Sequence, residues 1–310
     1  MTATLPTATT APERPVAGPY FWLALLRLAL RSRRLALGLG ILAIFALTAL
    51  IGPWLVDDPD AVSVDLGQGP SGAHWLGTTQ TGQDVFAQLV VSARGTLLIG
   101  AAVAALATAV SVVVGIGGGF LGGVADETIS LISNVFLVIP GLPLVIVVSA
   151  YVKGGGLSAT IFAIALTSWA ASARVLRAQT LSLRTRDYVL AARVYGEKRW
   201  RIVLVEIVPN ELAIIVSQFI HAAIFAVLTQ TGLAFLGLAD LSHLTWGTML
   251  YFAQGAEALA GGAWWWFVPP GLCTALLGTA LSLVSFGLDE VLDPRLRTRR
   301  PRQRQRKEAR

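Results

Sequence analysis

Apolar runs long enough to cross a lipid bilayer constrain this chain more than any other feature of its sequence. They occupy residues 35–56, 96–120, 129–151, 157–176, 212–236 and 264–288. At about 1.5 Å per residue, roughly 20 helical residues cross the ~30 Å hydrocarbon core of a bilayer. Only 14% of the residues are charged, whereas soluble domains carry about 25%. The sequence therefore predicts an all-α, polytopic membrane protein with six transmembrane helices.

The third of these runs contains residues that disfavour a straight helix. Pro140, Gly141 and Pro143 lie near the middle of 129–151. We expect a kinked span there, because neighbouring helices can satisfy the carbonyl groups that a proline leaves free. Such a kink could line a transport pathway or could only serve helix packing.

Basic residues are concentrated in three segments that indicate the orientation of the chain in the membrane. They lie at 27–34, at 174–201 and at 295–310. Lys and Arg that flank transmembrane helices favour the cytoplasmic side, and six spans place both termini on one side. We therefore expect both termini to be cytoplasmic. The distribution favours this interpretation over nucleic-acid binding by the basic tail.

The expected organisation follows from these runs and clusters. Residues 1–34 are expected to form a cytoplasmic tail with a lead-in helix at 20–34, and 35–56 the first transmembrane helix. Residues 57–93 would form an extracytoplasmic loop. Residues 94–290 would form the core transmembrane domain, including a cytoplasmic loop at 184–210 and a polar outer loop at 237–263. Residues 291–310 would form a basic cytoplasmic tail.

The chain lacks the motifs by which an enzyme or a metal site is recognised. It contains no GxxxxGK[ST], no HExxH and no ordered Ser/His/Asp set. His74, His221 and His243 are too scattered for metal-ligand spacing, and the single Cys273 excludes a disulfide framework. His74 beside Trp75 could suggest a ligand site, but an aromatic anchor at the membrane interface is the favoured interpretation. We expect no catalytic residue, no metal and no cofactor.

The longest charged interruption, 187–210, reads as a short helix, a glycine hinge and a second short helix. Tyr188 to Arg193 are good helix formers, and Gly196 tolerates a turn that other residues resist. Glu197, Lys198, Arg199 and Arg201 then precede an aliphatic run that reaches Pro209. A charged, hinged segment between apolar spans predicts a docking element for a soluble partner. An ordinary cytoplasmic loop is the alternative.

The same segment resembles the EAA loop of the membrane subunits of binding-protein-dependent ABC importers. The matching residues are Leu190-Ala191-Ala192, Gly196 and Val208-Pro209-Asn210, with Leu190 where the family usually has Glu. The run from His74 to Thr78, with Gly82 to Val85, resembles an outer-loop pattern of dipeptide, oligopeptide and nickel permeases. Trp246 to Leu250 and Leu292 to Arg297 are similar to the C-terminal half of that subfamily. The first span and the long outer loop look like the C-type subunit of such a permease pair.

The resemblance implies a type I ABC importer transmembrane fold in a bacterial inner membrane. Its partners would be a B-type permease subunit, two cytoplasmic ATPases that bind the ATP, and an extracytoplasmic solute-binding protein. It implies that the short helix docks on the ATPase through Tyr188, Leu190, Ala191 and Ala192. Gly196 would permit the turn, and rim contacts would come from Glu197, Lys198, Arg199 and Arg201. The substrate would be a di- or oligopeptide, with nickel or another small solute as the alternative.

Polar residues inside the fifth run are candidates for the translocation pathway. Gln218, His221 and Gln230 lie there, and intramembrane polar residues are functional candidates by default. Hydrogen bonds between packed helices are an equal alternative for them. A secondary transporter that works without an ATPase remains a different class of function. It would require coupling carboxylates or broken helices at mid-membrane, and Asp126, Glu127 and Glu211 are expected at the ends of spans. A membrane scaffold is a third reading.

Overall fold

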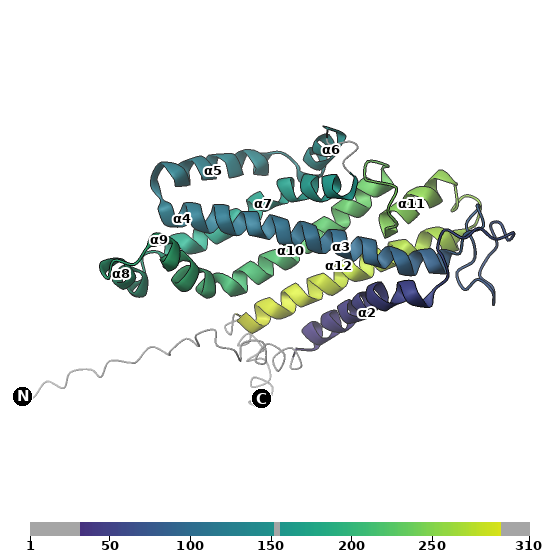
Figure 1. Cartoon of the computed structure of the whole chain (residues 1–310), viewed down its shortest axis with the longest axis horizontal. Coiled ribbons are helices and arrows are strands. Elements are labelled where there is room, and N and C mark those ends of the chain that lie inside the picture. The colour runs from purple at the N-terminus through teal and green to yellow at the C-terminus, as the bar shows by residue number, and fades with distance from the viewer. Residues whose placement is uncertain (1–31, 152–155, 293–310) are drawn as a thin grey trace, which may run out of the picture.

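The computed structural model describes residues 32–151 and 156–292, and every regular element in them is a helix (Figure 1). The lead-in helix expected at 20–34, apart from its last residues, and the basic tail expected at 291–310, apart from its first two residues, lie outside the described residues. The first half contains α2 (Arg33–Leu55), α3 (Val85–Ser111), the π-helix η1 (Val112–Ile116), α4 (Gly117–Leu121), α5 (Gly123–Val138), α6 (Gly141–Tyr151) and α7 (Gly156–Leu183). The second half contains α8 (Asp187–Val194), α9 (Arg199–Arg201), the π-helix η2 (Ile202–Ile207), α10 (Val208–Phe235), α11 (Trp246–Gly255) and α12 (Trp264–Leu292).

Five continuous helices in the described chain are long and apolar enough to cross a membrane. They are Arg33–Leu55, Val85–Leu121, Gly156–Leu183, Arg199–Phe235 and Trp264–Asp289, and the bent pair α5–α6 makes six if it counts as one span. α10 contacts α3, α7 and α12, while α2 lies against α12 and α3. Figure 1 shows these long helices side by side, with α8 at one end of the bundle and α11 at the other. The predicted all-α, polytopic architecture is confirmed.

The third span is broken rather than kinked. α5 and α6 meet at an angle of 96°. Pro140 lacks an N–H and disfavours helical geometry in the residue before it, and Ile139 accordingly has an extended backbone at φ −79° and ψ 127°. α6 is held at this angle by Val145, which is buried in the core formed by α3, α7 and α10.

Two spans are longer than the sequence indicated. The second begins at Val85, eleven residues before the expected 96, so the end of the outer loop 57–93 is already helical. The fifth begins at Arg199 and is continuous through η2 and α10. The second short helix expected after Gly196 is therefore the first part of a long helix and not a separate element. Pro209 lies in the first turn of α10, directly after η2, where the α-helical hydrogen bonding is already interrupted.

The segment 237–263 contains a buried helix instead of only a polar loop. In α11, Trp246 is 1% exposed and donates its indole N–H to the backbone oxygen of Leu89. Its ring meets Phe45 edge-on at 5.2 Å between centroids. The helix begins with a capping box, in which Thr245 and Thr248 each accept the other's backbone N–H. The acidic composition of this stretch concealed the apolar residues that pull it into the bundle.

Candidate functional site

The backbone between α8 and α9 turns at Gly196, which has a positive φ of +78°. Gly196 donates its N–H to the carbonyl of Arg193, and Glu197 donates to the carbonyl of Ala192. This pair of hydrogen bonds is a Schellman motif, and it terminates α8 at a position where glycine is favoured. The expected hinge therefore corresponds to a defined helix cap that fixes the direction of α8 relative to α9.

α8 rests on the bundle through one side only. Val189 is 0% exposed and packs with Ile116, Leu176 and Ile202 at the end of the bundle. The opposite side carries Tyr188, Leu190, Ala191, Val194 and Tyr195, which we call the α8 outer face. Tyr195 at its end is 87% exposed. Such a run of apolar and aromatic side chains is unusual for a helix that extends beyond the membrane spans.

The four residues expected to dock together differ in exposure. Tyr188, Leu190 and Ala191 are exposed, whereas Ala192 is partly buried against the cluster around Val189. The chain's own core therefore occupies part of the Ala192 surface. Val194 and Tyr195, which the sequence reasoning did not select, take its place on the α8 outer face. The sequence could have indicated them, because Val194 and Tyr195 follow Leu190 and Ala191 by four residues and so lie on the same side of a helix.

Charged residues surround the C-terminal end of α8, which we call the base of α8. Glu197 lies 3.6 Å from Arg201, one helical turn further on. Lys198 and Arg199 are exposed, and the Arg193 guanidinium lies 5.0 Å from the centre of the Phe120 ring. A cleft of about 310 Å³ opens here, lined by Phe120, Leu121, Arg193, Glu197, Arg199 and Ile202. Most of the positive charge predicted for this loop is thus exposed rather than neutralised.

The three residues predicted to line a translocation pathway all lie on α10 and differ in their surroundings. Gln218 is half-buried, and His221 is exposed with its Nδ1 atom 2.9 Å from the backbone oxygen of Ser217. Gln230 is buried and donates to the hydroxyl of Thr245, at the start of α11. Gln230 therefore packs at the end of the bundle where α11 lies (Figure 1). Of these three residues, only His221 is exposed on the surface of α10.

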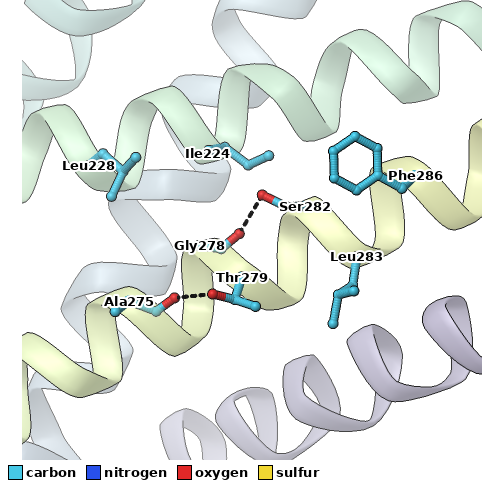
Figure 2. A pocket seen from close by; sticks show the side chains of 8 residues that line it. All are labelled: Ile224, Leu228, Ala275, Gly278, Thr279, Ser282, Leu283 and Phe286. Atoms are coloured by element: carbon cyan, nitrogen blue, oxygen red, sulfur yellow. Dashed lines mark hydrogen bonds between the residues drawn. The ribbon is translucent and has the colours of Figure 1, made fainter.

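A lateral groove lies between α10 and α12, close to His221 in sequence. Figure 2 shows Ile224 and Leu228 of α10 opposite the small residues Gly278 and Ser282 of α12. The groove has a volume of about 360 Å³. Its two hydroxyl groups are satisfied within their own helix, since Thr279 donates to Ala275 and Ser282 to Gly278. The groove is thus an apolar surface suited to a helix or an acyl chain, without polar groups that would bind a polar solute.

A buried carboxyl group, Glu211, was missed by the sequence reasoning, which placed it at the end of a span. It is 0% exposed in α10, and its Oε1 atom accepts a hydrogen bond of 2.8 Å from Thr180 of α7. Its Oε2 atom has no partner among the described residues. Buried ionisable groups in membrane helices are functional candidates. Only the three-dimensional contact with α7 reveals its burial, because in sequence it simply follows Pro209 and Asn210.

At the α11 end of the bundle, opposite to α8, hydrogen bonds organise the segments that precede α3 and α11 and the start of α12. His74 Nδ1 lies 2.7 Å from Asp84, which also caps the start of α3, and Trp265 donates to the carbonyl of Thr78. Ser242 donates two hydrogen bonds to Asp240, from its hydroxyl and its backbone N–H, and these hold the pKa of that carboxyl below its usual range. Within the described residues, no group of three His, Cys, Asp or Glu side chains could hold a metal ion.

Residues 111–298 match the family model described as "Binding-protein-dependent transport system inner membrane component". The chain is 34% identical over 275 residues to the oligopeptide transport system permease protein OppC of Bacillus subtilis (strain 168), covering 87% of this chain and 88% of the relative. It is 32% identical to the dipeptide transport system permease protein DppC of the same organism, covering 86% and 84%. The OppC protein of Mycobacterium tuberculosis (strain ATCC 25618 / H37Rv) is 32% identical over 258 residues, covering 83% and 87%.

Proposed function

Because this chain belongs to the family of inner membrane components of binding-protein-dependent transport systems, we propose that it is the C-type permease subunit of an ATP-driven peptide importer. Peptides are the proposed substrate because the most similar relatives reported above carry peptide transport in their names. Nickel or another small solute is the alternative. The chain forms one half of the pathway, and a B-type permease subunit supplies the other half.

The α8 outer face is the observation that carries the coupling role. A soluble partner of the chain can bury Leu190, Val194 and Tyr195, all of which are exposed here. Burial of apolar surface stabilises an interface by about 25 cal/mol per Å² before the costs of association. We assign the partner as a cytoplasmic ATPase that binds and hydrolyses the ATP, so the permease itself holds no cofactor. Glu197, Lys198, Arg199 and Arg201 then orient the contact at its rim.

Continuity of the long helix supports transmission from that contact to the membrane. α8 is joined by the Gly196 cap to a helix that is unbroken from Arg199 to Phe235. Movement of α8 with the ATPase would therefore tilt α10, on which the exposed His221 lies. We place the pathway along the side of α10 that carries Gln218 and His221. A helix of the B-type subunit occupies the groove between α10 and α12.

The proposed orientation has the α8 end and both termini in the cytoplasm of a bacterial cell, with the chain in the inner membrane. The basic residues that follow α7 support it, because Lys and Arg favour the cytoplasmic side of a membrane. The outer segments 57–93 and 237–263 carry acidic residues and no Lys or Arg. Their only titratable nitrogen side chains are His74 and His243. These segments face the extracytoplasmic solute-binding protein.

Co-purification tests the coupling role. The chain is expressed with its neighbouring B-type subunit and ATPase, as wild type and as Ala191→Arg/Tyr195→Asp, which adds charge to the α8 outer face. The variant is expected to lose the ATPase and to keep the B-type subunit. Val64→Asp is a matched control, because Val64 is exposed in the outer loop. Retention of the ATPase by the α8 variant would contradict the proposal.

Two observations favour a second candidate, a secondary transporter that needs no ATPase. The α5–α6 span is broken, and Glu211 is a buried carboxyl in a membrane helix, both of which occur in such transporters. Vesicles that contain the two permease subunits, the ATPase and the binding protein separate the classes. Uptake of labelled dipeptide that requires ATP supports the importer, whereas uptake driven by a proton gradient without ATP supports the secondary transporter. Uptake of nickel in place of dipeptide would replace the proposed peptide substrate but leave the proposed importer class unchanged.

A further inference from the structure

The cleft at the base of α8 joins two kinds of surface that rarely meet inside a protein. Arg193 of α8 and Arg199 of α9 contribute guanidinium groups, while Phe120 and Leu121 of α4 and Ile202 of η2 contribute apolar walls. α4 is the last part of the span Val85–Leu121, and η2 follows the start of the span Arg199–Phe235. The cleft therefore lies where two membrane helices reach the water interface.

The charges that line this cleft leave an excess of positive charge. In the described part of the chain, neither Arg193 nor Arg199 has a carboxylate partner within ion-pair distance. Glu197 is the one acidic residue in the lining, and it pairs with Arg201 at 3.6 Å. The guanidinium carbon of Arg193 lies 5.0 Å from the centre of the Phe120 ring, within the range of a cation–π contact. Two guanidinium groups are suited to bind the oxygens of a phosphate.

From this arrangement we propose that the cleft binds the phosphate headgroup of an anionic phospholipid, such as phosphatidylglycerol. The shared chemistry of a lipid headgroup and free phosphate is the phosphate itself. Leu121 favours the lipid, because it lines the cleft yet is 56% exposed at the end of a membrane span. The first methylene groups of a lipid would cover that side chain, and free phosphate would leave it in water. Basic pockets between transmembrane helices at the cytoplasmic side have this preference.

A lipid in this position would connect α4, α8 and α9. α4 and α8 already meet through the apolar cluster of Phe120 and Val189 and through the contact of Arg193 with the Phe120 ring, whereas no residue of α9 belongs to that cluster. Headgroup binding would thus restrict how far α8 can move away from the end of α4. None of the residues that line the cleft belongs to the α8 outer face, and only Glu197 and Arg199 are shared with the proposed rim of the ATPase contact.

Photolabelling of the full chain tests this proposal without any ATPase. The protein is placed in nanodiscs of phosphatidylcholine that contain a trace of photoactivatable phosphatidylglycerol or photoactivatable phosphatidylcholine, and the labelled peptides are mapped. Label from phosphatidylglycerol is expected on peptides that carry Phe120–Leu121 and residues 193–202, in excess over phosphatidylcholine. Arg193→Gln/Arg199→Gln should lower that excess by roughly thirtyfold, the effect of removing two charges at the membrane surface.

Matched variants keep the test decisive. Arg33→Gln/Arg186→Gln also removes two exposed arginines but leaves the cleft intact, so it should retain the label. Arg193→Lys/Arg199→Lys keeps the charge and should recover part of the label, which separates a charge effect from misfolding. Equal labelling by both lipids, or full labelling of the Gln variant, would overturn the proposal. Displacement of the label by millimolar inorganic phosphate would overturn the lipid source and assign the cleft to free phosphate. Loss of ATPase coupling has no bearing on these readouts, so the two proposals fail independently.

Discussion

α8 and α11 are both short helices at the ends of the same bundle, and they differ in what covers them. α8 has one buried residue in its eight, whereas α11 has six buried residues in its ten. Both are rich in apolar and aromatic residues. α11 completes the core of its own chain, and α8 leaves a comparable surface exposed. An apolar helix outside the spans can therefore pack either against its own chain or against a partner. The number of its residues that are buried within the chain distinguishes the two cases.

Replacement of Trp246 by Ala is the strongest way to break the α11 side of this comparison. Trp246 fills a buried site and donates a hydrogen bond to Leu89. Truncation of a buried Trp is expected to lower the unfolding free energy by about 3–5 kcal/mol. Titration of the purified protein with SDS in mixed micelles measures the change. Trp75→Ala is the control, since Trp75 is exposed in the outer loop, and a loss as large as that of Trp246→Ala would show that burial does not decide the effect.

Replacement of Val189 by Ala tests whether α8 depends on its single buried residue. Two methyl groups leave a fully buried site beside Ile202. We expect a loss of about 2 kcal/mol from the lost burial and the remaining cavity. Because α8 has so few other contacts, cleavage by protease between residues 186 and 198 should increase as well. Unchanged proteolysis would mean that the Gly196 cap alone holds the helix in place.

The cap of α11 should have a smaller effect. Thr245→Ala removes the hydroxyl that accepts the backbone N–H of Thr248 and the amide of Gln230. Loss of an N-cap costs about 1 kcal/mol. Thr245→Ser keeps the hydroxyl and should behave as wild type in the same SDS titration. If Ala and Ser variants were equally stable, the capping box would contribute nothing to α11.

The smallest effect on stability is expected for the α8 outer face. Tyr195→Ser removes an aromatic ring that is 87% exposed, and such surface changes usually alter the unfolding free energy by less than about 0.5 kcal/mol. The same change should nevertheless weaken co-purification of the ATPase. A stability loss like that of Val189→Ala would show that Tyr195 packs against its own chain, and the comparison between α8 and α11 would fail.

The positions of most spans could be predicted from the sequence, but the contacts between them could not. Long apolar runs and the sharp turn at Gly196 depend on local properties, and both could be predicted. The break at Pro140 was underestimated as a kink, because its angle depends on where Val145 finds a buried site. α11 was missed because Asp240, His243 and Glu257 around it make the segment look like a polar loop, and its burial depends on contacts such as that of Trp246 with Leu89.

The candidate site divides in the same way. Tyr188, Leu190 and Ala191 were selected from a motif and are exposed in the structure, while the inward direction of Ala192 follows from the position of Val189. The burial of Glu211 depends on Thr180 of a different helix. The cleft at the base of α8 unites two segments that are far apart in the chain, 120–121 and 193–202, and no local pattern predicts that they meet.

The 96° break between α5 and α6 also restricts the order in which the protein can be assembled in its membrane. Lipid offers no hydrogen bonds, so the backbone groups freed near Ile139 and Pro140 need protein around them. α7 packs against α5 and α6, and Phe225 of α10 approaches Gly141. These neighbours are synthesised after the break, and Ile139 and Pro140 are still exposed once they are in place. We therefore expect the α5–α6 segment to reach its final position only after α7 and α10 have been inserted and a partner subunit has covered the break.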